Sequence, residues 1–171
     1  RSMGSSSNNV LSALEKIPRE IFLPSTFQSY AYENNPLPIG FEQTISQPYI
    51  VALMTEALSL KGSEVILEIG TGSGYQTSIL SLLSRRVYSI ERIKALLVNA
   101  QSCFKKLKLT NIISEFGDGF LGWPKLAPFD HMIITCAVKK IDNRLLNQIR
   151  VNGSCVAVSY THLRAHETRY H

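Results

Sequence analysis

From residue 65 onward, the chain alternates short apolar runs with segments in which apolar residues recur at helical spacing. The apolar runs predict strands near residues 65–69, 86–90, 112–116, 130–136 and 154–158. Such alternation is typical of a parallel sheet covered by helices on both faces. Right-handed crossovers then bring the carboxyl ends of the strands to one edge. We therefore predict an α/β fold that binds its ligand at that edge.

The first 62 residues follow a different pattern. Residues 1–9 are rich in Ser and Asn and predict a disordered lead, and residues 10–17 predict a short amphipathic helix that Pro18 ends. Prolines and aromatic residues predict an irregular segment over residues 22–39, and a helix begins at Pro48. We expect a single domain over residues 10–157, with a helical and loop cap (10–62) on a cofactor-binding core (63–157).

The first apolar strand runs into a glycine-rich turn, Gly70-Thr71-Gly72-Ser73-Gly74, and then into a helical pattern. Glycines let the main chain approach a ligand that a Cβ would displace, and amides at the start of a helix face that ligand. A dinucleotide site would place the third glycine at Tyr75, whereas here it is Gly74. A tight turn without a ligand is the alternative, but it does not explain three alternating glycines.

Two acidic residues follow later strands and are expected at the same edge of the sheet. Glu91 comes 21 residues after Gly70, where an acid commonly accepts hydrogen bonds from ribose hydroxyls. Asp118, between Gly117 and Gly119, is placed to meet an adenine amino group. The alternatives are a solvated acid at a helix start for Glu91 and an Asp-Gly turn for Asp118.

The acid Glu68 stands two residues before Gly70, and this Glu-x-Gly-x-Gly-x-Gly order resembles motif I of the S-adenosylmethionine-dependent methyltransferases. The resemblance implies a Rossmann-like class I fold that uses S-adenosylmethionine. The residues expected to hold this cofactor are Glu68, Gly70, Thr71, Gly72, Gly74, Glu91, Gly117 and Asp118. Nucleic-acid bases are disfavoured as methyl acceptors, because residues 133–138 lack an Asn/Asp-Pro-Pro-aromatic motif and the chain has no Pro-Cys nucleophile.

The segment Pro36–Tyr49 indicates the methyl acceptor. Together with residues 18–24, 67–77, 89–93, 117–123 and 128–130, it closely resembles the bacterial protein-L-isoaspartate O-methyltransferases over roughly residues 10–157. The resemblance implies methylation of the α-carboxylate of L-isoaspartyl residues in damaged proteins, which starts their repair to aspartate. It also implies that Ser46 is the catalytic residue and that Gln43, Thr44 and Ile45 border the cofactor and substrate. Without the resemblance, Ser46 would be interpreted as a helix cap ahead of Pro48.

Composition adds little to this interpretation. The formal charge is +5, but acids and bases are interspersed and no Lys/Arg block exceeds two residues, so no nucleic-acid partner is expected. Three widely spaced cysteines fit reduced thiols in a cytoplasm, and no run reaches membrane-spanning length. We expect a cytoplasmic monomer without a metal. His131 more plausibly packs than binds a ligand, and the pair His162 and His166 is a weak metal candidate.

From residue 158 the chain leaves the family pattern. The string Val158-Ser159-Tyr160-Thr161-His162-Leu163-Arg164 resembles one translated frame of a sequencing-library adapter, so we expect residues 158–171 to be a non-native tail. The final strands of the family fold would then be missing, and the strand at 154–158 would be a bare apolar edge. The alternative functions are therefore a non-catalytic S-adenosylmethionine-binding module or an inactive truncated fragment.

Overall fold

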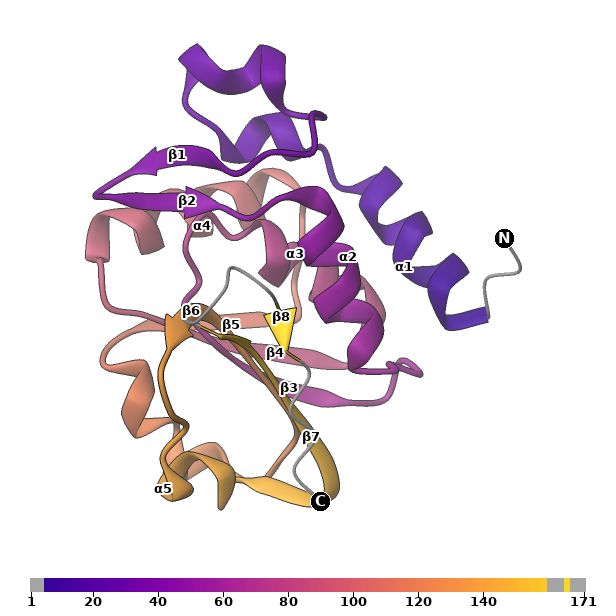
Figure 1. Ribbon diagram of the computed structural model, residues 1–171, viewed down its shortest axis with the longest axis vertical. Helices are drawn as coiled ribbons and strands as arrows, with labels where there is room; N and C mark the ends of the chain where they lie inside the picture. Colours follow the sequence, from indigo (N-terminus) through magenta and orange to yellow (C-terminus); the bar gives the residue numbers. More distant parts are fainter. Residues whose placement is uncertain (1–4, 160–164, 167–171) are drawn as a thin grey trace.

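The computed structural model describes residues 5–159 and 165–166. Its main sheet has the strand order β5-β4-β3-β6-β7-β8 (Figure 1). Every neighbouring pair is parallel except β7 and β8, which are antiparallel. The strands are β3 (Val65–Ile69), β4 (Arg86–Glu91), β5 (Ile112–Phe116), β6 (Phe129–Val138), β7 (Ile149–Ser159) and β8 (Ala165–His166).

The helices cover the sheet on both faces. They are α1 (Ser5–Lys16), α2 (Pro48–Ala57), α3 (Tyr75–Leu83), α4 (Lys94–Lys106) and α5 (Asn143–Leu146). On one face α2 and α3 pack on alternate residues of the central strands, including Ile66 and Ile133. On the other face, α5 and the loop around Trp123 cover Leu67 and Met132. The α/β expectation is confirmed, with β3 and β6 at the centre of the sheet, where Ile66, Leu67, Met132, Ile133 and Ile134 are buried.

The N-terminal part lies over the end of the sheet. It contains two 3₁₀ helices, η1 (Arg19–Phe22) and η2 (Ser25–Tyr30), and a hairpin of β1 (Leu37–Gly40) and β2 (Gln43–Ile45). In Figure 1 this hairpin lies beyond the upper ends of the strands, next to α2. The buried apolar residues of the N-terminal part come from α1, η1 and the hairpin, and they form one cluster with residues of α3. The expected cap therefore packs on the cofactor-binding core through apolar contacts.

Two expectations need correction. The first helix begins at Ser5, so the predicted disorder was wrong for residues 5–9, while residues 1–4 lie outside the described part. A Ser/Asn-rich start is compatible with a helix whose later apolar residues, such as Val10, are buried against the domain. The edge expected at 154–158 is not bare, since β8 pairs with Ala157 and Val158. The rest of the expected tail, residues 160–164 and 167–171, lies outside the described residues.

The strands at 65–69 and 112–116 have the predicted bounds, whereas β6 and β7 are longer than predicted. Strand β7 continues back to Ile149 through polar residues that an apolar pattern does not mark as strand. Within the described residues, no helix is long and apolar enough to cross a bilayer. That part of the chain also holds no group of three His, Cys, Asp or Glu side chains arranged for a metal ion.

Candidate active site

A cavity of ≈ 670 Å³ lies at the carboxyl ends of β3, β4 and β6. The glycine turn after β3 forms part of its wall, and β2 with the start of α2 borders it from the N-terminal part. Ten of the twelve predicted site residues line it: Gln43, Thr44, Ile45, Ser46, Gly70, Thr71, Gly72, Glu91, Gly117 and Asp118. Parallel topology is the reason, because segments far apart in the chain end at the same edge of the sheet.

The three glycines of the turn have different roles. All have positive φ angles, of +96°, +55° and +89° for Gly70, Gly72 and Gly74. A Cβ on Gly70 would lie 2.7 Å from Thr135 Oγ1, so this glycine is required by its contact with β6. A Cβ on Gly72 would have only one neighbour, at 3.9 Å. Gly72 is therefore the position where a glycine leaves open space at the cavity wall.

Gly74, which was predicted as a cofactor residue, is not among the residues that line the cavity. A Cβ there would lie 2.8 Å from the Phe104 ring and 2.9 Å from Ala100 Cβ, both in α4. This glycine lets α3 and α4 approach closely where α3 begins. Sequence spacing could not separate the two roles, because both require a glycine in a turn before a helix.

Glu68 is also absent from the cavity wall. Its side chain is fully buried, and its Oε1 accepts hydrogen bonds from Thr77 Oγ1 and from Ser89 Oγ, the latter at 2.7 Å. Its Oε2 has no partner among the described residues. Burial raises the pKa of Glu68 to about 7, and the two hydroxyl donors partly oppose that rise. Glu68 thus joins β3 to α3 and β4 through these two hydroxyls.

Glu91 ends β4 and is held rigidly at the cavity wall. Its Oε1 accepts from Gly72 N at 2.8 Å, and its Oε2 accepts from Ile93 N at 2.8 Å. The side chain is only 5% exposed. Each carboxylate oxygen keeps further acceptor capacity beyond one amide, so the fixed carboxylate is able to accept hydroxyl hydrogen bonds from a ligand.

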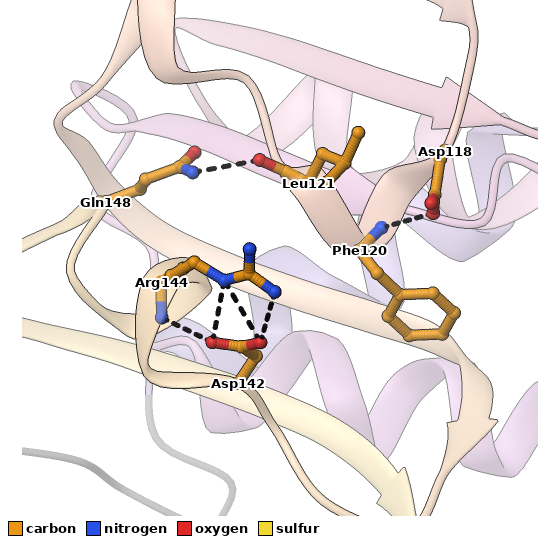
Figure 2. Close-up of polar contacts among 6 residues, drawn as sticks. All are labelled: Asp118, Phe120, Leu121, Asp142, Arg144 and Gln148. Carbon is orange, nitrogen blue, oxygen red and sulfur yellow. Dashed lines mark hydrogen bonds and ion pairs between the residues drawn. The ribbon is translucent and has the colours of Figure 1, made fainter.

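Asp118 follows β5 and lies at the start of the short helix η3 (Gly119–Leu121). Figure 2 shows its carboxylate accepting a hydrogen bond from Phe120 N, at 3.0 Å. The Asp-Gly turn therefore exists and the same residue lines the cavity, so the two interpretations of Asp118 are compatible. Gln148 holds the far end of this loop, because its Nε2 donates to Leu121 O at 3.1 Å and its Oε1 accepts from Trp123 N at 2.9 Å.

The segment Gln43–Ser46 also lines the cavity. Thr44 is exposed, Ile45 is buried in the N-terminal core and Ser46 is half-buried. The N-cap of α2 is Gln47, whose side chain makes no capping hydrogen bond. The helix-cap interpretation of Ser46 is therefore wrong, and the Ser46 hydroxyl is not engaged in capping.

Sequence reasoning missed the residues that β6 contributes. Thr135, Cys136 and Ala137 line the cavity at the carboxyl end of this strand. Thr135 Oγ1 donates to Ile69 O at 3.2 Å and also to Gly70 O, so it fixes the turn to β6. Burial raises the pKa of the Cys136 thiol, which disfavours a nucleophilic thiolate. Their position at the end of the fourth predicted strand, residues 130–136, was the available signal.

These residues fit an S-adenosylmethionine site. The cavity wall contains Gly72, which has open space where a Cβ would lie, the hydrogen-bonded carboxylate of Glu91 and a second carboxylate at Asp118. The cavity is of the size that small ligands occupy. Fold and site together define a Rossmann-like, S-adenosylmethionine-dependent methyltransferase.

The chain belongs to the protein-L-isoaspartate(D-aspartate) O-methyltransferase family, whose model matches residues 1–161. The protein-L-isoaspartate O-methyltransferase of Dictyoglomus turgidum is 54% identical over 153 residues, which cover 90% of this chain and 70% of that protein. Its counterpart from Caulobacter sp. is 50% identical, over 92% of this chain and 72% of that protein. Members of this family are enzymes that use S-adenosylmethionine to methylate isoaspartyl residues in protein repair.

Solved structures agree with this assignment. A protein-L-isoaspartate O-methyltransferase structure superimposes with a TM-score of 0.83 at 29% identity, over 95% of this chain and 54% of that chain. A second structure, from Plasmodium falciparum and in complex with S-adenosyl-L-homocysteine, has a TM-score of 0.79 at 20% identity, over 92% of this chain and 79% of that chain. The second similarity shows the shared fold. Both known chains extend beyond the matched part.

Proposed function

We propose that this chain transfers the methyl group of S-adenosylmethionine to the α-carboxylate of L-isoaspartyl residues in damaged proteins. In this reaction a carboxylate oxygen forms a bond to the methyl carbon, and the carbon–sulfur bond breaks with its electron pair moving to sulfur. The methyl ester then closes to a succinimide, which can reopen to aspartate. The supporting observation is that Gln43–Ser46 and the Gly70–Gly72 turn, which are far apart in the sequence, line the same cavity.

The chemistry requires positioning more than proton transfer. A carboxylic acid with a pKa near 4 is roughly 99.9% ionised at pH 7, so a general base would contribute little. Fixing the acceptor oxygen in line with the methyl group and the sulfur contributes on the order of 7–11 kcal/mol. Ser46 is suited to orient an acceptor oxygen by a hydrogen bond, because it is a serine that lines the cavity and is not the N-cap of α2.

The partner side follows from the same proposal. The chain acts on isoaspartyl-containing proteins and peptides as a monomer, without a nucleic-acid partner, in the cytoplasm. Three free cysteines, of which Cys103 and Cys155 are buried, support a reducing compartment. Size-exclusion chromatography with light scattering tests the monomer.

The central experiment measures methyl transfer from labelled S-adenosylmethionine to an isoaspartyl peptide and to its aspartyl twin. We expect transfer to the isoaspartyl peptide alone. Binding of the cofactor without transfer to either peptide would refute the proposed reaction and indicate the non-catalytic binding module. A rise in melting temperature with a nicotinamide cofactor, but not with S-adenosylmethionine, would refute the cofactor assignment itself.

A further inference from the structure

Arg19 is a buried cation whose hydrogen bonds all go to main-chain carbonyls. The residue begins η1 and is only 1% exposed. Its Nη2 donates to Asn35 O and to Ser46 O, both at 3.0 Å. Its Nη1 donates to Ala31 O and, at 3.5 Å, to Glu33 O. Within residues 5–159 and 165–166, no carboxylate forms a salt bridge with it.

Burial of this charged side chain is unfavourable for the free energy of folding if the residue serves only to fill space. Burial of a charge without a counter-charge is unfavourable, and an apolar side chain of similar volume would often pack as well. A guanidinium differs from any apolar residue in one respect: its rigid fork of donors fixes several oxygens relative to one another. The oxygens that Arg19 fixes belong to the segment 31–35 and to Ser46.

Ser46 lies where the main chain has no regular structure to hold it. Strand β2 ends at Ile45 and α2 begins at Pro48, so Ser46 lies in the connection between them. Arg19 joins its carbonyl to Asn35, and a second contact joins the same two segments, because Tyr49 N donates to Asn34 Oδ1 at 3.1 Å. The hydrogen bond from the buried guanidinium therefore fixes the position of the Ser46 carbonyl.

We propose that Arg19 is a positioning residue for methyl transfer, which sets the place of the Ser46 hydroxyl at the cavity wall. This inference rests on the proposed function of Ser46. Arg19 does not line the cavity and has no hydrogen bond to the glycine turn, although its guanidinium lies 6.0 Å from the centroid of the Tyr75 ring, which does line the cavity. Because its hydrogen bond goes to Ser46, we expect the larger effect on the acceptor side. Positioning errors of about 1 Å reduce rates by about 100-fold, so a small displacement of Ser46 is measurable.

The test compares Arg19→Lys with the wild type. The lysine keeps the charge but loses the fork of donors. We expect kcat for the isoaspartyl peptide to fall by about 10-fold to 100-fold, with the dissociation constant for S-adenosylmethionine changed by less than about 3-fold. Ile17→Val is the matched control, since Ile17 is buried in the same N-terminal core and does not line the cavity; it should lower the melting temperature and leave kcat unchanged.

A double-mutant cycle separates positioning from general destabilisation. If Arg19 acts through Ser46, Arg19→Lys should lower kcat by less than about 3-fold in a Ser46→Ala background. Equal fold losses in both backgrounds, or an unchanged kcat in the single variant, would overturn the proposal.

Hydrogen exchange gives a readout that does not depend on activity. With S-adenosylmethionine present, exchange over residues 43–49 should be at least about 10-fold faster in Arg19→Lys, while exchange over residues 66–80 is unchanged. Wild-type exchange rates at residues 43–49 in the variant would refute the positioning role. Failure of the wild type to methylate the isoaspartyl peptide would instead refute the proposed function, and the exchange result would still decide the role of Arg19.

Discussion

Substitution of the second and third glycines of the turn by alanine should separate ligand binding from stability. In Gly72→Ala the new Cβ meets only Ile39 Cδ1, at 3.9 Å, and the φ of +55° lies in the left-handed region. The folded state should lose about 1–2 kcal/mol from that backbone conformation alone. The methyl group enters open space at the cavity wall, so the dissociation constant for S-adenosylmethionine should rise by at least about 10-fold, or 1.4 kcal/mol.

Gly74→Ala should give the opposite balance. Its φ of +89° carries a backbone penalty as well, and its Cβ would lie 2.8 Å from the Phe104 ring and 2.9 Å from Ala100 Cβ. Overpacking of this kind adds about 1–3 kcal/mol, so the total loss should be about 2–5 kcal/mol. Because Gly74 does not border the cavity, the affinity of the folded variant for S-adenosylmethionine should change little.

The assay pairs urea denaturation with calorimetric titration of S-adenosylmethionine. Titrations are run at a temperature where the denaturation curves show each variant folded. Wild-type affinity in Gly72→Ala would refute the inference that this glycine faces the ligand. An affinity loss in Gly74→Ala as large as that in Gly72→Ala, without the greater loss of stability, would refute the division of roles.

Three further substitutions test other parts of the site. Ser46→Ala should lower turnover of the isoaspartyl peptide while cofactor affinity stays nearly unchanged; equal losses in titration and single-turnover assays would contradict an orienting role. The pKa of Glu68 is raised from 4.5 to about 7 in the folded state, so between these two values the folded protein keeps a proton that the unfolded chain has lost. The free energy of unfolding should therefore fall by up to about 3 kcal/mol as the pH rises from 4.5 to about 7. Glu68→Gln should remove this dependence, measured by urea denaturation at about pH 5 and about pH 7.5; the same pH slope in both proteins would count against it. Gln148→Leu should lower the free energy of unfolding by about 2 kcal/mol or more, because Trp123 N and Leu121 O lose their hydrogen-bond partner. It should also weaken cofactor binding, because the same loop carries Asp118. An unaltered free energy of unfolding would contradict the role of Gln148.

Much of the fold was predictable, because each core strand of the sheet appears in the sequence as a short apolar run. The strands at 65–69 and 112–116 were predicted with the observed bounds. The apolar runs of central parallel strands reflect burial on both faces. Residues 5–9 and the polar start of β7 were missed, since their structure depends on what packs or pairs beside them.

The site was predictable as a set of positions but not as a set of roles. The order of glycines and acids indicated a methyltransferase cofactor, and ten of the predicted residues line the cavity. Glu68 and Gly74 do not line the cavity and contact neighbouring elements, although their spacing relative to Gly70 is what made the motif recognisable. Arg19 gave no local signal, and the signal for Thr135 was its position at the end of a predicted strand.

The sequence by itself determined the alternation of strands and helices, the positions of positive φ in the glycine turn and the family. Only the tertiary structure decided which glycine leaves open space, which acid is buried away from the ligand and which cation holds the Ser46 main chain. The physical reason is that residue type and spacing encode backbone angles and burial along one segment. Close contacts such as those of Thr135 with Gly70 and of Arg19 with Ser46 arise only when the sheet order and the packing of the N-terminal part bring separate segments together.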